Sequence, residues 1–186
     1  MSPLFPRALT RRLKPMAISG KVFYSLPMAS DKNLVGAAGE NLVLSRLLSR
    51  GILASQAPRG TRKADILVNP LDGGSPLLIQ VKTTLHTGNR AKWHMKEKHE
   101  DVKDKDMFYC FVDLGEKDSD IFVIPAKVVS QTIKSSYKAW LETPGKKGQA
   151  HNETVMRWIT SKYPWKVAGI SDEWMDEYLE NWALIQ

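Results

Sequence analysis

The chain has 186 residues, of which 42% are hydrophobic and 25% are charged. This composition excludes a wholly disordered polypeptide and is sufficient for one domain with a hydrophobic core. The single cysteine, Cys110 in the apolar run MFYCFV, excludes disulfides within the chain and is expected to be a buried, unreactive thiol. No apolar run reaches the ~20 residues that a membrane-spanning helix needs, so we expect a cytoplasmic (intracellular) protein with no membrane partner.

The formal net charge of +7 is concentrated near the N-terminus. Residues 1–30 hold five of the 27 basic residues and no acidic residue, which leaves 22 basic against 20 acidic residues in the rest of the chain. We expect residues 1–30 to form a basic, disordered arm. A role of this arm in organelle targeting stays open, and so does the choice between Met1 and Met28 as the true start. Because the remainder is nearly neutral, any anionic partner must bind at local basic patches.

The first regular element after this arm is a helix, predicted from about Asn33 to Arg50 by apolar residues at helical spacing. Gly51 follows the helix at the position where a left-handed cap favours glycine. Gly36 and Gly39 lie inside the helix, where each costs about 1 kcal/mol relative to alanine. Glycine at these positions allows another backbone or a ligand to come close to the helix.

Five extended segments are predicted after the helix. They are Ile52–Gln56, Ala64–Asn69, Pro76–Thr84, Met107–Leu114 and Asp120–Pro125. The turn-rich sequence NPLDGGSP joins the second and third as a hairpin. The charged stretch between the third and fourth is expected to be a loop with one helical turn. A short sheet flanked by helices, with α/β content, follows from this order.

The C-terminal part contains two further predicted helices. The first lies within residues 125–142, and the second begins near Ser171, where Trp174, Tyr178 and Trp182 repeat every four residues. Such a repeat is typical of a buried helix face. We therefore expect a core over residues 31–142 and, over residues 143–186, a C-terminal loop and helix packed on it.

The stretch IQVKTT, residues 79–84, combines an apolar face with a polar one. Side chains of a strand alternate between faces, so Gln80 and Lys82 share one face. The preceding strand of the hairpin begins beside Asp65, which brings an acid, an amide and an amine to one end of the sheet. Glu40 joins them if the first helix turns it toward that end.

The sequence GENLVLSRLLSRGILASQAPRGTRKADILV followed by IQVK resembles the PD-(D/E)XK nuclease superfamily, and its pattern is most similar to the branch with archaeal Holliday-junction resolvases. The resemblance covers residues 34–84. It implies a restriction-endonuclease-like core with a central mixed sheet flanked by helices and, here, a helical C-terminal extension. By this likeness Glu40 matches the helix acid, Asp65 the metal-binding acid, Gln80 the usual acidic position and Lys82 the catalytic lysine.

The resemblance implies a Mg²⁺-dependent endonuclease that acts on DNA, with Mn²⁺ as a substitute. Asp65, Gln80 and Glu40 would hold the metal, and the uncharged amide of Gln80 predicts weaker metal binding than an acid would give. Lys82 would orient or deprotonate the attacking water, or stabilise the anion. Two alternatives stay open: a non-catalytic nucleic-acid-binding module on the same fold, and a protein-interaction domain that uses the six tryptophans. A homodimer would suit a two-strand cut and is also left open.

Two loops beside the predicted site supply candidates for contact with the nucleic-acid backbone. They contribute Arg59, Thr61, Arg62, Lys63, Thr83, Arg90 and Lys92. Trp93 is a candidate for stacking on a base, and the loop of residues 143–153 together with Arg157 is a candidate for closure over DNA. The spacing of the four histidines matches no structural zinc pattern, so zinc is not expected.

Overall fold

The computed structural model describes residues 14–18, 21–25, 31–58, 60, 61, 63–71, 73–86, 91–115 and 118–185. Within the predicted arm, β1 (Lys14–Ile18) and β2 (Lys21–Ser25) pair as an antiparallel hairpin. This hairpin was not among the predicted elements. The prediction for the rest of residues 1–30 lies outside the described residues.

The first helix, α1, runs from Lys32 to Ser49 and confirms the predicted helix. The carboxylate of Asp31 caps its N-terminus by accepting the backbone N–H of Asn33 at 2.8 Å. Its C-terminus is followed by Gly51 with φ 75°, a left-handed conformation that costs glycine little. The helix buries one stripe of residues at four-residue spacing, which comprises Val35, Gly39, Val43 and Leu47.

Five strands form a mixed central sheet in the order β3-β4-β5-β7-β8. Their bounds are Ala54–Gln56, Ile66–Val68, Leu77–Leu85, Met107–Leu114 and Asp120–Pro125. All neighbouring pairs are antiparallel except β5 and β7, which are parallel. The sheet and the two helices confirm the predicted α/β class, and each strand falls within its predicted segment or within one residue of it.

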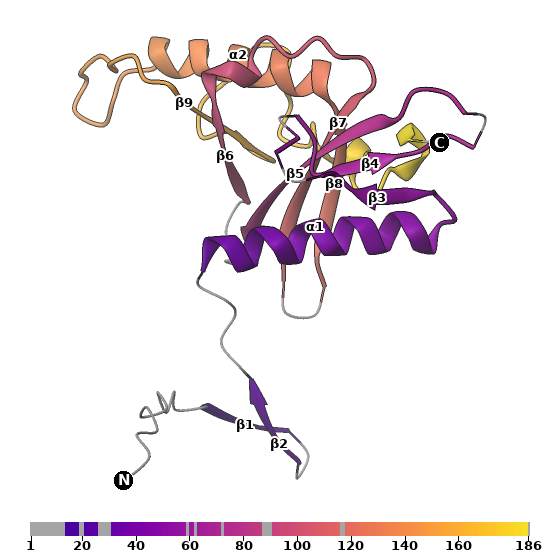
Figure 1. The fold of residues 1–186 in the computed structure, drawn as a ribbon. Coiled ribbons are helices and arrows are strands. Elements are labelled where there is room, and N and C mark those ends of the chain that lie inside the picture. The colour runs from indigo at the N-terminus through magenta and orange to yellow at the C-terminus, as the bar shows by residue number, and fades with distance from the viewer. Residues whose placement is uncertain are drawn as a thin grey trace, which may run out of the picture.

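The sheet lies between two layers, with α1 on one face and α2 (Ala126–Glu142) on the other (Figure 1). A hydrophobic cluster fills the space on each face. Strand β7 contributes to both clusters, as expected for a central strand with a parallel neighbour. Cys110 in β7 is buried as predicted, and burial raises the pKa of its thiol. Among the described residues, neither helix is long and apolar enough to cross a lipid bilayer.

A second small sheet corrects the prediction of a charged loop between β5 and β7. Strand β6 (Lys92–Lys96) pairs antiparallel with β9 (Met156–Thr160) on the α2 side. Trp93 and Met95 are buried, whereas His94 between them and Lys96 after them are exposed, so a period-two pattern was present within the charged run. The expected helical turn is the 3₁₀ helix η1 (Glu97–His99).

The predicted C-terminal helix is wrong. From Ser171 onward the chain forms turns and two short 3₁₀ helices, η2 (Asp176–Tyr178) and η3 (Trp182–Ile185). The backbone N–H of Glu180 donates to the carbonyl of Ile121 at 2.8 Å, so the chain crosses along the edge of β8 and leaves any helical path. Trp174 therefore packs on the α2 side and Trp182 on the α1 side, although their spacing suggested one face.

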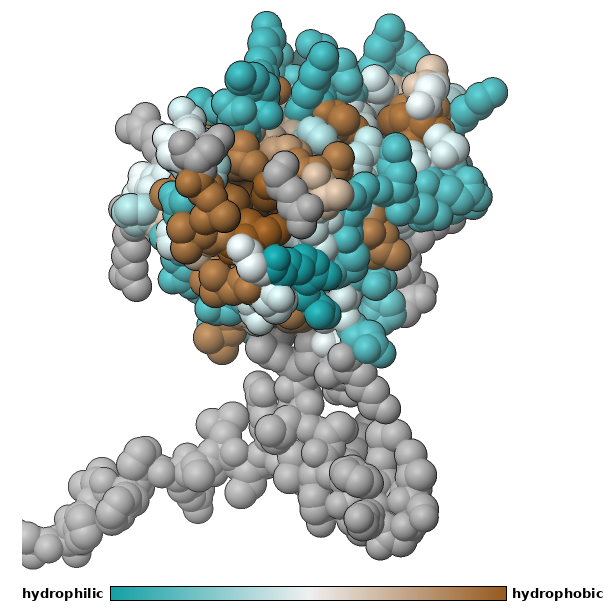
Figure 2. All heavy atoms as spheres, turned by 90° about the vertical axis from the view of Figure 1, so that its right-hand side faces the viewer, coloured by the Kyte–Doolittle hydropathy of each residue, from teal (hydrophilic) through white to brown (hydrophobic). Residues whose placement is uncertain are grey.

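Figure 2 shows apolar side chains around a hollow on the side of the molecule where α1 ends. The hollow has a volume of about 620 Å³ and is lined by apolar residues that include Leu53, Leu71 and Ile185. Leu53 and Leu71 are strongly exposed, at 53% and 87%. This surface lies at the opposite end of β5 from the polar residues described next.

Candidate active site

The candidate site lies at an open edge of β5. Strand β4 pairs with β5 only as far as Ile66 opposite Ile79, while β5 continues to Leu85 with β7 as its partner on the other edge. Asp65 directly precedes Ile66, the first residue of β4. Its backbone N–H donates to the carbonyl of Ile79, and its Oδ2 accepts the backbone N–H of Val81, both at 2.8 Å. The carboxylate thus takes the place of a strand partner at the start of this open edge.

Gln80 and Lys82 share the face of β5 that looks toward α2. In the parallel register they lie beside Tyr109 and Phe111, which belong to the hydrophobic cluster on that side. Ile79 and Val81 point to the α1 side and are buried, at 0% and 7% exposure. The predicted division of IQVKTT into an apolar and a polar face is therefore confirmed.

Glu40 approaches the same edge from α1. The helix comes so close to β5 that a Cβ on Gly39 would stand 1.9 Å from Thr83 Oγ1. The neighbour at Gly39 is a side chain, where a backbone or a ligand was expected, and a Cβ on Gly36 would meet nothing within 4 Å, so the expectation for Gly36 is wrong. Glu40 is the residue that follows this contact. Burial raises the pKa of Glu40, the charge of Asp65 raises it further, and the ammonium of Lys82 lowers it. Glu40 therefore lies within electrostatic reach of both residues.

Lys82 carries its amine in a partly buried position. Burial lowers the pKa of Lys82 most strongly, and the neighbouring charge of Lys98 lowers it further, while the carboxylates of Asp65 and Glu40 raise it. A lysine with a lowered pKa gives up or takes back a proton more readily near neutral pH than a free lysine does. Two acids and such an amine at one strand edge can hold a cation and an anion side by side.

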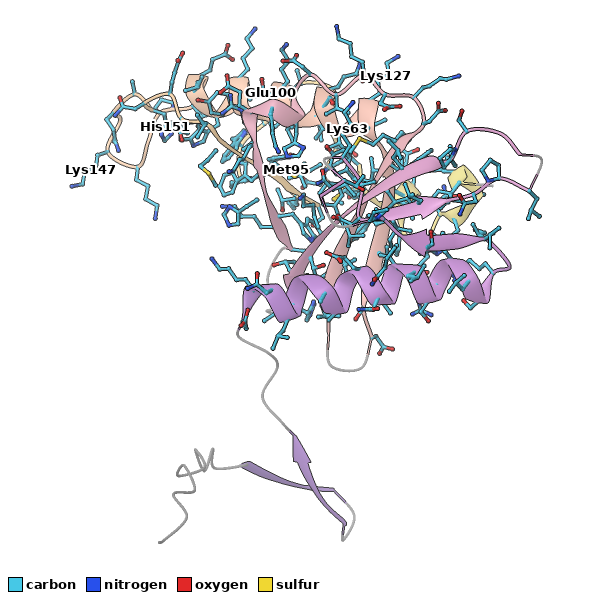
Figure 3. All side chains as sticks on the ribbon, in the orientation of Figure 1. Lys63, Met95, Glu100, Lys127, Lys147 and His151 are labelled. Carbon is cyan, nitrogen blue, oxygen red and sulfur yellow. The ribbon has the colours of Figure 1, made fainter. Side chains whose placement is uncertain are left out.

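A cavity of about 380 Å³ opens on the α2 side of this edge. Gln80 lines its floor together with residues of the β3–β4 loop and of the η1 turn, among them Lys63, Lys98 and His99. Figure 3 shows Lys63 in the middle of the molecule, below the turn that carries Glu100. The lining contains three lysines and two aspartates, which favours an anionic group near Gln80.

Carboxylate and amide oxygens, the groups that Glu40, Asp65 and Gln80 carry, are of the type that binds hard cations such as Mg²⁺ and Mn²⁺. Mg²⁺ is commonly bound through one or two carboxylates, with waters and substrate phosphates completing its shell. Glu40 and Asp65 supply two carboxylates, and a cation would relieve their mutual repulsion. The Gln80 amide lines the neighbouring cavity, whose lining includes neither carboxylate. Within the part of the chain that the structure describes, no three His, Cys, Asp or Glu side chains gather as a metal-binding group, so a site here depends on the amide.

Of the predicted contact residues that the structure describes, only Lys63 lines the cavity beside Gln80. The hydroxyl of Thr61 donates to the carbonyl of Pro58 at 2.7 Å and closes a turn. Lys92 places its Nζ 2.9 Å from the centre of the Trp158 ring and lines a separate cavity. Arg59, Arg62 and Arg90 lie outside the described residues.

Thr83 does not join the polar face. Strand alternation turns it toward α1 with Val81, and its Oγ1 is buried beside Gly39 without a hydrogen-bond partner in the described structure. The hydroxyl therefore faces away from the side on which Lys82 lies. Its position identifies Thr83 as a packing residue between β5 and α1.

Two further predictions from the sequence are corrected. Trp93 is 2% exposed and its indole N–H donates to the carbonyl of Val112 at 3.0 Å, so it cannot stack on a base. Arg157 is buried in an ion pair with Glu100. In Figure 3 the loop that bears Lys147 and His151 lies to the side of Lys63, and its closure over DNA stays a prediction.

The sequence reasoning missed His99 and Tyr109, which line the cavity from η1 and β7. Tyr109 stands beside Gln80 in the parallel register, and its hydroxyl lies 2.7 Å from Nδ1 of His99. Tyr109 could have been placed beside Gln80 only by knowing that β5 and β7 pair in parallel with this register. No signal in the sequence located His99, because its place depends on the turn that follows β6.

No protein-family model matches the chain, and no curated protein shows significant sequence similarity to it.

Proposed function

We propose that this chain is a metal-dependent endonuclease that hydrolyses phosphodiester bonds of DNA. The observation that carries the proposal is the placement of Asp65 at the open edge of β5, where its Oδ2 accepts the N–H of Val81, together with the mutual electrostatic influence of Glu40, Asp65 and Lys82. These residues come from α1, from the residue before β4 and from β5. Gly39 lets α1 pack closely against β5 beside Glu40, and a chance cluster of surface charges would not need this close packing.

The topology of the sheet supports a restriction-endonuclease-like core. One helix precedes the antiparallel strands β3, β4 and β5, and a parallel strand β7 follows beside β5. This is the order that the sequence resemblance implies. The segment between β5 and β7 contains β6 and η1, where we expected a loop.

Each residue has a distinct role in the proposed reaction. Asp65, Glu40 and the amide oxygen of Gln80 would hold Mg²⁺, which when bound lowers the pKa of water and polarises a phosphate. The hydrogen bond from Val81 holds the Asp65 carboxylate in place before any ligand arrives. Lys82 Nζ holds a proton beside the phosphate, where it offsets developing negative charge or exchanges that proton with the attacking water.

A nucleic-acid-binding module without catalysis is the second candidate, and Gln80 is the observation that favours it. An amide in place of an acid leaves two carboxylates, which weakens metal binding while the cationic cavity is unchanged. The third alternative, an interface of tryptophans, has less support. Four of the six indole N–H groups donate within the chain, those of Trp93, Trp165, Trp174 and Trp182.

The test is a cleavage assay on linear duplex, single-stranded and four-way-junction DNA with Mg²⁺ or Mn²⁺, and with EDTA as the metal-free control. We expect metal-dependent cutting that is lost in Lys82→Ala. Lys127→Ala, which removes an exposed lysine of α2 that points away from the site (Figure 3), should cut like the unmodified protein. Folded protein that binds DNA but cuts nothing would replace the enzyme with the binding module. Protein that neither binds nor cuts would refute both.

A further inference from the structure

His99 occupies a defined position above the candidate site. Its side chain belongs to η1, is 7% exposed and lines the cavity that Gln80 also lines. The Nδ1 atom lies 2.7 Å from the hydroxyl of Tyr109, which neighbours Gln80 in the sheet. Through Tyr109 the imidazole is therefore connected to the face of β5 that bears Gln80 and Lys82.

The imidazole is held from two sides. The single hydroxyl proton of Ser130 in α2 is shared between the carbonyls of His99, at 3.0 Å, and Val102, at 2.9 Å, which fixes the backbone of the turn. The His99 and Tyr109 rings meet edge to face at 73°, with their centres 5.8 Å apart. A ring held in this way needs little reorganisation to meet a ligand.

The second ring nitrogen, Nε2, is the one available to the cavity. Nδ1 is engaged by Tyr109, and within the described ranges no residue hydrogen-bonds Nε2. Nε2 is also absent from the buried atoms that lack a partner, which include Thr83 Oγ1 and Asp113 Oδ1. Solvent in the cavity therefore reaches this atom.

The proton of the neutral ring is expected on Nε2. Burial, with the charges of Lys82, Lys98 and Lys96, lowers the pKa of His99 to about 4, so the ring is uncharged at neutral pH. Burial raises the pKa of Tyr109, so its hydroxyl keeps its proton. When that hydroxyl donates to Nδ1, the ring carries its hydrogen on Nε2 and presents an N–H donor to the cavity.

A neutral donor among lysines is suited to an anionic oxygen. Lys63, Lys98 and Lys103 line the cavity and outnumber Asp101 and Asp104. A phosphodiester offers only acceptor oxygens, which match an N–H donor flanked by ammonium groups. A carboxylate ligand would meet the same donors, but the adjacent edge of β5 is where the proposed function already places a phosphate.

We propose that His99 binds substrate directly, its Nε2–H donating to a non-bridging phosphate oxygen of a DNA strand that enters the cavity beside Gln80, with Tyr109 as the positioning residue. This inference rests on the proposed function for the identity of the ligand. It adds a phosphate-binding residue that has no counterpart among the residues predicted from the sequence.

Two substitutions of His99 separate the ring nitrogens. In His99→Asn the amide reaches the position of Nδ1 and keeps a partner for Tyr109 but has nothing at Nε2, whereas in His99→Gln the amide reaches the position of Nε2. Binding of a fluorescent DNA duplex is measured by anisotropy with Ca²⁺ in place of Mg²⁺, and again in EDTA. We expect His99→Asn to weaken binding about tenfold, the loss of one hydrogen bond to a charged group, and His99→Gln to restore most of it. Equal affinity of His99→Asn and the unmodified protein would overturn the proposal.

A second measurement uses the unmodified protein and does not depend on how the variants fold. A long-range ¹H–¹⁵N NMR spectrum at pH 7 should report an unprotonated Nδ1 and a protonated Nε2 for His99, and addition of the DNA should shift the Nε2 signal. Tyr109→Phe removes the hydroxyl beside Nδ1, so a larger fraction of the His99 ring should carry its proton on Nδ1. A proton on Nδ1, or an Nε2 signal that DNA leaves unchanged, would refute the assignment.

The two proposals can fail separately. DNA binding that depends on His99 without any metal-dependent cleavage would remove the endonuclease and leave the phosphate contact standing. Cleavage that depends on Lys82, with a KM and a kcat that His99→Asn leaves unchanged, would remove the phosphate contact alone. Failure of the unmodified protein to bind DNA overturns the role of His99 in either case.

Discussion

The Oδ2 atom of Asp65 lies 2.8 Å from the backbone nitrogen of Val81, so a side chain continues the hydrogen bonding of β5 where β4 ends. Val81 is buried, and its N–H has no strand partner on that edge. One carboxylate therefore serves both the sheet and the candidate site. This double role allows charge and hydrogen bonding to be separated by substitution.

Asp65→Asn and Asp65→Ala are expected to differ in stability but not in activity. The amide oxygen of asparagine can still accept from Val81, whereas alanine leaves a buried N–H unpaired at a cost of about 1–3 kcal/mol. Both remove the charge that would hold the metal, so cleavage should fall by about 100-fold or more in each. Urea denaturation and the cleavage assay measure the two effects. Similar stability of the two variants would show that the hydrogen bond contributes little.

Gln80→Glu is expected to strengthen metal binding. A third carboxylate at the edge would add a full negative charge beside Glu40 and Asp65, and affinity for a hard cation rises with the charge of its ligands. The Mg²⁺ concentration for half-maximal cleavage should fall by about tenfold. Gln80→Met, which keeps the length but offers no oxygen, is the matched control and should raise that concentration. An unchanged midpoint in both variants would exclude residue 80 as a ligand.

Lys82→Met is expected to stabilise the fold at neutral pH. Burial lowers the pKa of Lys82 from its usual 10.5 in the folded protein, so the unfolded chain binds more protons between the two pKa values. Stability therefore rises with pH through that window, and below it the folded state carries the full cost of the buried charge. The advantage of Lys82→Met over the unmodified protein should be largest near pH 7 and shrink toward pH 10.5.

Urea denaturation across this pH range tests the sign of the effect. Lys127→Met is the control, because Lys127 is exposed on α2 and its replacement should change stability little at any pH. A Lys82→Met variant that is less stable than the unmodified protein at pH 7 would mean that the ion pairs with Asp65 and Glu40 outweigh the burial of the amine.

Gly39→Ala is expected to destabilise the protein, and Gly36→Ala is not. The added Cβ at Gly39 would meet Thr83 Oγ1 at 1.9 Å, an overlap that typically costs about 1–3 kcal/mol in a packed core. A Cβ at Gly36 meets nothing within 4 Å, so the helix propensity of alanine should add up to about 1 kcal/mol of stability.

The double variant Gly39→Ala with Thr83→Ala tests the contact itself. Removing the hydroxyl should recover part of the loss, because the clash is between these two side chains. The free energies of unfolding of the unmodified protein, the two single variants and the double variant give the coupling. If Gly39→Ala destabilises the protein equally with and without Thr83→Ala, the contact with the Thr83 side chain is not the cause of the loss.

The ion pair of His86 and Asp113 predicts a stability that falls with rising pH. Nδ1 of His86 lies 2.8 Å from Oδ2 of Asp113, and this hydrogen bond with the carboxylate charge raises the pKa of His86 above 6.5. The stabilisation is fully present below pH 6.5 and disappears as pH rises through the raised folded-state pKa. Denaturation of His86→Gln and the unmodified protein should differ more at pH 6 than at pH 9. His94→Gln, on an exposed face of β6, serves as the control.

Much of the sheet and one half of the site were predictable from local pattern. The glycine after the C-terminus of α1, the hairpin of β4 and β5, and the shared face of Gln80 and Lys82 all follow from residues within one element or its turn. The same alternation placed Thr83 on the α1 side, so its exclusion from the polar face could also have been derived. The C-terminal 3₁₀ turns could not, because helical spacing from Trp174 to Trp182 is overridden by a backbone bond to β8.

The sequence by itself determined α1, α2, the five strands of the central sheet and the shared face of Gln80 and Lys82, because those properties depend on neighbours a few residues away. The tertiary structure decided that the pairing of β4 with β5 does not extend past Ile66 and that α1 packs Gly39 against Thr83. It also decided that His99 of η1 lines the same cavity as Gln80. Each of these depends on contacts between segments far apart in the chain. Their free energy comes from packing and pairing that no periodicity in the local sequence records.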